Sequence, residues 1–261
     1  MDGFSALHFI NTWSDIARGA EDTVVAALDR TLLRARFPPT VHFEYQRCNP
    51  RHQRSTTSPN PPPVATLKLS KDQLVSLKNS IAGGRRRHVS TYEAVTAYAW
   101  RCACEARQMG GDQETRLYMT ADARTRLKLP LPPGYFGNAI LRTSVAAATG
   151  KILSSPLQST AEKIHDAVVR VDDEYVRSVI DFLESWQESQ KDLGAISWLH
   201  LPAYEADFGW GKPVFIQRAV VNQRGMLYLM RRPEGDGGIT LTMTMEPENR
   251  PRFLKMFYVE L

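Results

Sequence analysis

The sequence is poor in cysteine and contains no long apolar run. Its 261 residues include three cysteines, an odd number that forms no closed set of disulfides. Cys48, Cys102 and Cys104 match no metal-ligand spacing, so we expect reduced thiols and no metal site. No apolar run approaches the ~20 residues of a membrane-spanning helix, and no signal-peptide pattern opens the chain. These absences predict a cytoplasmic protein without a membrane segment.

Strongly one-sided charge is also absent. The 33 basic residues exceed the 28 acidic residues by five, and the excess is not gathered in a tail. The one basic cluster, residues 85–88, is too short to follow a nucleic-acid backbone. We therefore expect no nucleic-acid partner. A hydrophobic content of 43% is typical of a globular protein with a core.

Helical and strand-like patterns alternate along the chain and predict an α/β fold. Residues 45–63 are polar and rich in proline, which is typical of a linker. The helical pattern covers 4–17, 74–81, 91–102, 159–186 and 253–257, with capping boxes at Ser70 and Ser90. The strand pattern covers 64–69, 117–121, 139–148, 195–199, 214–221, 226–230 and 239–245, with a hairpin turn at 235–238.

Three stretches combine residue types that suit a binding site. Residues 204–213 pack a carboxylate, two glycines and two aromatic rings into a tight turn, although a plain turn between strands has the same composition. Asp122, Arg124 and Arg126 alternate, either as pairs across a turn or as a solvated salt-bridge face. Glycines at 134 and 137 allow a ligand to approach the backbone, and the amide of Asn138 can hold a carbonyl or a phosphate.

A helix start at Ser90 is a further candidate site. First-turn N–H groups and the helix dipole attract anions there, although simple capping explains the same residues. The arginine run at 85–87 directly upstream favours a phosphate ligand. His165 and Asp166 are adjacent on one helix and point in different directions, so they do not predict an acid–base pair.

Several of these motifs together resemble the plant BAHD acyltransferases, which transfer acyl groups from coenzyme A thioesters. Asp2-Gly3 resembles the end of the family's H-x-x-x-D-G motif, and residues 207–211 resemble its D-F-G-W-G motif. Residues 122–126 and 132–138 resemble the D-x-R-x-R and P-x-G-Y-F-G-N blocks. Residues 4–15 are similar to the corresponding segment of hydroxycinnamoyl-CoA shikimate/quinate transferases.

The resemblance implies a chloramphenicol-acetyltransferase-like fold of two domains. Residues 1–44 would be a remnant of the N-terminal domain, 45–63 the crossover linker and 64–261 the C-terminal domain. Residues 204–221 could pack on the N-terminal side. The family is monomeric, but we expect an exposed apolar face on helix 4–17, formed by Phe4, Leu7, Ile10 and Trp13, to promote association.

The resemblance also implies individual roles. Asp2 would orient structure behind the motif histidine, Asp207 would support the substrate channel, and Trp210 would lie near the tetrahedral intermediate. The acceptor would face Ile196 and Trp198. Acyl-CoA would be the cosubstrate, with no permanently bound cofactor, and would be held by Arg87, Ser90, Thr91, Asp122, Arg124, Gly137 and Asn138.

The motif histidine, which is the family's catalytic base, would lie before Met1. We therefore expect a truncated, inactive form of a hydroxycinnamoyl-type transferase. One alternative is a non-catalytic remnant that binds acyl-CoA or a partner. Another is an enzyme that uses residues of its own.

A second difference from the family's pattern predicts the kind of acceptor. Relatives that use shikimate carry an arginine before the Ser-Trp pair, expected to grip the acceptor carboxylate, and a threonine directly before that pair. Here residues 184–194 contain no arginine, and Ile196 stands at the threonine position. Because few side chains replace a bidentate guanidinium, the sequence argues against shikimate or quinate and favours an amine or another alcohol.

Overall fold

Six strands form one mixed sheet in the computed structural model, which describes residues 1–21, 23–43, 64–83, 88–184, 193–217 and 225–259. The strand order is β1-β6-β5-β4-β2-β3, and only the β2–β4 and β4–β5 pairs are parallel. The strands are β1 (Val64–Leu69), β2 (Glu114–Asp122), β3 (Ile140–Ala148), β4 (Leu193–Ser197), β5 (Met226–Arg231) and β6 (Ile239–Thr244).

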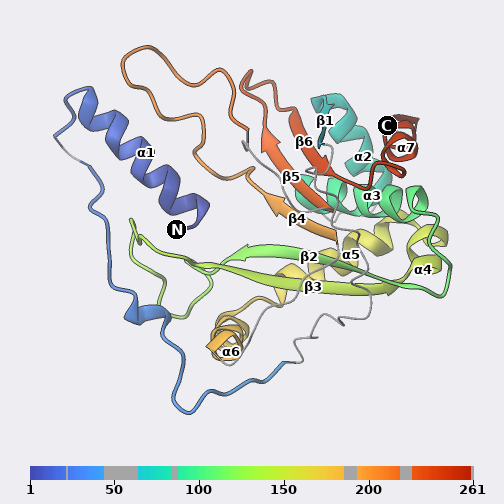
Figure 1. Ribbon diagram of the computed structural model, residues 1–261, viewed down its shortest axis with the longest axis horizontal. Helices are drawn as coiled ribbons and strands as arrows, with labels where there is room; N and C mark the ends of the chain where they lie inside the picture. Colours follow the sequence, from blue (N-terminus) through green and yellow to red (C-terminus); the bar gives the residue numbers. More distant parts are fainter. Residues whose placement is uncertain (22, 44–63, 84–87, 185–192, 218–224, 260–261) are drawn as a thin grey trace.

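Most helices gather around α3 (Thr91–Ala106), whose residues are almost all buried. Figure 1 shows α2 (Lys71–Ala82), α4 (Thr149–Ser154), α5 (Leu157–Val169) and α7 (Arg250–Val259) grouped with it beside the sheet. Trp100 of α3 is fully buried and donates from Nε1 to the hydroxyl of Thr115 on β2 at 3.0 Å. Because most residues of α3 are buried and Trp100 is bonded to β2, the position of α3 relative to the sheet is fixed.

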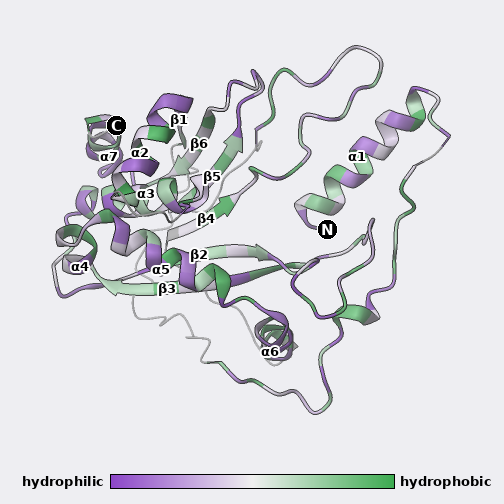
Figure 2. Cartoon of the chain, turned by 180° about the vertical axis from the view of Figure 1, so that it is seen from behind, coloured by the Kyte–Doolittle hydropathy of each residue, from purple (hydrophilic) through white to green (hydrophobic). Residues whose placement is uncertain are grey.

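A smaller core joins α6 (Asp173–Glu184) to the ends of β2 and β3. Figure 2 shows apolar residues concentrated on strands such as β4 and β5, with polar residues prominent on α2 and α6. The buried members of the smaller core are Ala121, Ala123, Leu127, Leu131, Tyr135, Ala139, Leu141, Val171, Tyr175, Val176 and Val179.

The local signals in the sequence are confirmed where they are strongest. Both capping boxes form, at Ser70 with Gln73 and at Ser90 with Glu93. The hairpin between β5 and β6 turns through Gly235 and Gly237, both at positive φ. Cys102 and Cys104 are buried thiols, and burial raises the pKa of Cys104. Cys48 and the whole predicted linker, residues 45–63, lie outside the described residues.

Two predicted elements differ from the structure. The helix predicted over 159–186 is two helices, α5 and α6, because Asp172 begins a new one: its carboxylate accepts the N–H of Tyr175 at 2.9 Å. The strand predicted over 214–221 is not formed at 214–217, where Val214 and Phe215 are 88% and 59% exposed. An apolar run thus indicates a strand only where a neighbouring strand is available to pair with it.

The N-terminal helix α1 (Gly3–Ala17) lies apart from the helical layer (Figure 1). Its buried residues are the small polar Ser5 and Ser14, whereas Phe9, Trp13 and Ile16 are each more than half exposed. The expected apolar face is therefore exposed at Ile10 and Trp13 and half-buried at Phe4 and Leu7.

The exposed face of α1 should bind a hydrophobic dye, because contiguous exposed apolar side chains attract one. The double variant Phe9→Gln/Ile16→Gln should lower the fluorescence of 8-anilinonaphthalene-1-sulfonate relative to the unsubstituted chain. Val169→Gln, at a similarly exposed apolar residue of α5, is the control and should change it little. Equal fluorescence in the double variant and the control would count against the exposed face.

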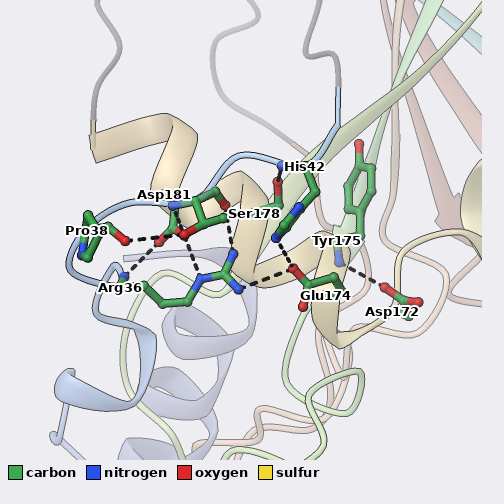
Figure 3. A network of polar contacts seen from close by, with 9 residues as sticks. Arg36, Pro38, His42, Asp172, Glu174, Tyr175, Ser178 and Asp181 are labelled. Atoms are coloured by element: carbon green, nitrogen blue, oxygen red, sulfur yellow. Dashed lines mark hydrogen bonds and ion pairs between the residues drawn. The ribbon is translucent and has the colours of Figure 1, made fainter.

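The segment that follows α1 passes a short 3-10 helix (Thr31–Leu33) and is fastened to α6 by Asp181 (Figure 3). The Asp181 side chain is only 1% exposed and accepts from the backbone N–H of Arg36 at 2.8 Å, from its Nε at 2.7 Å and from the N–H of Thr40 at 2.9 Å. Arg36 also reaches Glu174 at 3.2 Å. Burial alone would raise the pKa of Asp181, but the hydrogen bonds from Thr40 and Arg36 outweigh it and hold the pKa below its ordinary value.

Asp181→Asn should lower the free energy of unfolding by about 2–3 kcal/mol, because it leaves Arg36 without its buried counter-charge. Glu174→Gln is the control. Its side chain is 49% exposed, and its loss should cost less than about 1 kcal/mol.

Since the folded pKa of Asp181 lies below 3.8, its contribution to stability is present above pH 3.8 and is lost as pH falls through the folded value. Urea titrations at pH 7 and pH 3 test both statements, and equal losses for the two variants at pH 7 would contradict the first.

Candidate functional site

The carboxylate of Asp2 and the guanidinium of Arg124 form the centre of a polar cluster between α1 and the end of β2. Arg124 lies 3.0 Å from both Asp2 and Asp122 and donates to the carbonyl of Gly137 at 3.1 Å. Asp2 also accepts the N–H of Ser5, as the N-cap of α1, and that of Ala139 at 2.9 Å. The side chains of Asp2 and Arg124 are 7% and 14% exposed, so this pair is shielded from water.

The pKa of Asp2 reflects this setting. Burial raises it, but the hydrogen bonds from Arg124, Ser5 and Ala139 lower it further than burial raises it, and the net shift is downward. A carboxylate that accepts this many hydrogen bonds is a poor proton acceptor at neutral pH. The geometry thus fits an orienting role for Asp2 and not that of a base.

The loop around Gly137 is tied to α1 by Ser5. The Ser5 hydroxyl accepts the N–H of Gly137 at 3.0 Å and donates to its carbonyl at the same distance. The backbone of Gly137 is therefore occupied by protein contacts, whereas the neighbouring Asn138 is exposed. Arg126 lies away from this cluster, where it donates to the carbonyls of Val168 and Val171 at the end of α5.

Residues 207–211 form a turn closed by the carboxylate of Asp207. It accepts the N–H groups of Gly209 at 2.8 Å and Gly211 at 2.9 Å, and these bonds lower the pKa of Asp207. Both glycines have φ near +100°, a backbone conformation that favours glycine. Phe208 packs edge-on against Trp13 of α1, with ring centroids 5.1 Å apart, whereas Trp210 is 93% exposed.

The start of α3 is closed by a reciprocal pair of hydrogen bonds. The hydroxyl of Ser90 accepts the N–H of Glu93 at 3.1 Å, and the Glu93 carboxylate accepts the N–H of Ser90 at 2.9 Å. The second carboxylate oxygen lies 2.7 Å from Nδ1 of His165 on α5. Thr91 is the first residue of the helix, and Arg87 lies outside the described residues.

Ile196 and Trp198 lie at the end of β4, beside β5. Ile196 pairs with Tyr228, and the ring of Trp198 meets that of Tyr228 edge-on at 6.3 Å. Both residues are half-buried. This position can present an apolar and aromatic wall to a ligand.

Apart from Arg87 and Asn138, the predicted site residues fall into four groups. Asp2, Asp122, Arg124 and Gly137 meet in one cluster, and Asp207 shares its turn with Trp210. Ser90 and Thr91 share a helix start, and Ile196 and Trp198 share a strand end. The sequence did not indicate the Asp2–Arg124 pair or the Glu93–His165 pair, which join residues 122 and 72 positions apart.

In the part of the chain that the structure describes, no helix is long and apolar enough to cross a membrane. Among the same residues, no group of three or more His, Cys, Asp or Glu side chains is placed to hold a metal ion.

Comparison with known proteins identifies the family. The model of the Transferase family matches residues 1–259. The chain belongs to this family. Its motifs and the similar proteins identify the family as that of the BAHD acyltransferases.

Similar curated proteins are plant hydroxycinnamoyltransferases. Putrescine hydroxycinnamoyltransferase 1 of Oryza sativa subsp. japonica is 45% identical and is matched by 100% of this chain. Shikimate O-hydroxycinnamoyltransferase of Nicotiana tabacum is 39% identical and is matched by 98%. The chain spans 64% of the length of each of these two relatives.

Solved structures support the fold. Vinorine synthase is 19% identical, with a TM-score of 0.72 over 100% of this chain and 59% of its own. TRI101 of F. graminearum, solved with coenzyme A and deoxynivalenol, is also 19% identical, with a TM-score of 0.76 over 97% of this chain and 62% of its own. The predicted chloramphenicol-acetyltransferase-like α/β fold is therefore confirmed, whereas the division at residues 44 and 63 stays a prediction.

Arg124→Met should release α1, because it leaves the shielded Asp2 carboxylate without its counter-charge at a cost of about 3 kcal/mol. Hydrogen exchange at the amides of residues 3–17 should accelerate, while exchange in α3 changes little. Arg126→Met is the control, since Arg126 contacts α5 and not α1. If both variants accelerate exchange in α1 equally, the pair does not anchor the helix.

Proposed function

We propose that this chain supplies the acyl-CoA-binding part of a hydroxycinnamoyl-type acyltransferase. One observation carries the proposal: residues of three family blocks, Asp2, Arg124 and Gly137, meet in one shielded cluster within a chain that matches the family over residues 1–259. The cluster holds the segment that would follow the motif histidine against the loop that would line the acyl-CoA channel. The reaction is the attack of an acceptor hydroxyl or amine on the thioester carbonyl, with release of the coenzyme A thiol.

The proposed roles divide the site between coenzyme A and the acceptor. Thr91 at the start of α3, with the arginines at 85–87, would bind coenzyme A phosphates, because helix starts and guanidinium groups both attract phosphate. Asn138 is exposed and could contact the pantetheine arm. The contacts of Asp122, Arg124 and Gly137 are with the protein itself, so we assign them a supporting role in the channel wall.

We propose an amine as the acceptor. The names of the similar proteins include an enzyme for putrescine in rice, one for shikimate in tobacco and one for 5-hydroxyanthranilate in Avena sativa. The rice protein is the more similar of the first two, and residues 184–194 of this chain contain no arginine to hold a carboxylate. Ile196 and Trp198 would form the apolar wall against which an alkyl amine packs.

A second candidate is a non-catalytic acyl-CoA-binding protein that acts as a cytoplasmic monomer or associates through α1. It is favoured by one observation: Phe9, Trp13 and Ile16 of α1 are each more than half exposed, which suits contact with a partner.

The 261-residue chain should bind coenzyme A weakly but should not transfer p-coumaroyl groups to putrescine or shikimate. Loss of a general base typically costs ~10²–10⁴-fold in rate, so turnover within about tenfold of the rice relative would contradict the expected inactivity. Calorimetry should show binding that weakens steeply as salt is added, because the phosphates provide most of the contact.

Ser90→Ala should weaken this binding, because it removes the cap that orders the helix start. Ser80→Ala on α2 is the control, since its hydroxyl bonds only within its own helix. No heat at millimolar coenzyme A, together with no transfer, would contradict the proposed function and leave only the fold.

A further inference from the structure

His165 of α5 contacts a carboxylate in the first turn of α3. Its Nδ1 lies 2.7 Å from Oε1 of Glu93. This distance is at the short end of the range for hydrogen bonds to a charged group. The Glu93 side chain is 10% exposed and that of His165 is 40% exposed. The contact thus joins a shielded carboxylate to an imidazole whose other edge can reach solvent.

The two oxygens of the Glu93 carboxylate make different contacts. Oε2 accepts the N–H of Ser90 and completes the capping box, while Oε1 faces His165. The N–H groups of Thr91 and Tyr92, next in the first turn, have no acceptor within the helix. Among the described residues, none accepts a hydrogen bond from either group.

The charge of Glu93 has opposite effects on the helix and on a ligand. A carboxylate in the first turn stabilises a helix, but it repels a second anion that approaches the same N–H groups. A hydrogen bond from an imidazole offsets part of the negative charge of the carboxylate near these N–H groups. It also fixes the direction of the carboxylate. In this arrangement a phosphate can bind the free N–H groups with less repulsion from Glu93.

A cavity beside Glu93 leaves room for its carboxylate to change direction unless another residue holds it. A cavity of about 60 Å³ between α2, α3 and α5 is lined by Glu93 together with Ile81, Val89, Gln158 and Glu162. It is too small for a nucleotide, but it gives the Glu93 side chain room to change its rotamer. Glu162 would repel the carboxylate there, so without His165 the preferred alternative is a turn toward the helix start.

We propose that His165 is a positioning residue for the phosphate-binding start of α3. It holds the Glu93 carboxylate between Ser90 and α5 and offsets its charge, so that the N–H groups of Thr91 and Tyr92 remain available to a phosphate of coenzyme A. The inference rests on the proposed function, since coenzyme A is the proposed ligand. His165 itself does not touch the ligand or the reacting atoms.

The inference is tested by titrating the 261-residue chain with coenzyme A in a calorimeter. His165→Ala should weaken binding about threefold to tenfold, the usual effect of one uncompensated charge near a helix end. His165→Asn should restore binding, because the asparagine amide donates from nearly the position of Nδ1. His200→Ala, at an exposed histidine outside this contact, should bind like the unsubstituted chain.

A double-substitution cycle separates positioning from mere packing. Glu93→Gln removes the charge and should bind coenzyme A at least as tightly as the unsubstituted chain. In that background His165→Ala should have no further effect, because there is no carboxylate charge left to offset. Pantetheine, which lacks the nucleotide phosphates, should bind all four proteins equally.

The outcomes distinguish this inference from the proposed function. No coenzyme A binding by the unsubstituted chain would overturn both. Binding that His165→Ala leaves unchanged, or a loss that persists in the Glu93→Gln background, would overturn the positioning role alone. If His165→Ala does not fold, as judged by circular dichroism, Glu93→Gln decides: a severalfold loss of affinity in that variant overturns the inference.

Discussion

The ion pair between Asp2 and Arg124 is the constraint on which the arrangement of the candidate site depends. It links the start of α1 to the end of β2, and its further bonds fix the loop at Gly137 and Ala139. Two shielded charges are tolerated there only because each is matched and hydrogen-bonded. The hydroxyl of Ser5 adds a buried contact between α1 and Gly137, whereas the contact of Trp13 with Phe208 lies near the surface.

The same use of arginine recurs through the molecule and explains how the positive charge is distributed. Arg36 fastens the N-terminal segment to α6, Arg126 closes the end of α5, and Arg107 pairs with Glu246 ahead of α7. Each guanidinium joins elements that are distant in sequence, which suits its fixed, multidentate geometry. These guanidinium groups are therefore used for contacts within the protein.

The sequence predicted the features that depend on residues close together in the chain. The capping boxes at Ser70 and Ser90 formed because their partners lie three residues away, and β1 spans the residues 64–69 that were predicted as a strand. The break at Asp172 was missed because the apolar pattern continues from α5 into α6 at nearly the same period. The exposed residues at 214–217 were mistaken for a strand because hydrophobicity alone does not supply a pairing partner. The Glu93–His165 contact depends on how α3 and α5 pack, for which one sequence carries no signal.

The burial of α3 decides how a remote change can reach the start of that helix. Its side chains fill the main core, and Trp100 is anchored to β2 through Thr115, so a substitution on α5 cannot easily shift the helix as a body. What can change at low cost is the direction and charge of a side chain in its first turn. A residue such as His165 therefore acts on the helix start through electrostatics rather than through movement, and a neutral residue at position 93 should abolish its influence while leaving the fold unchanged.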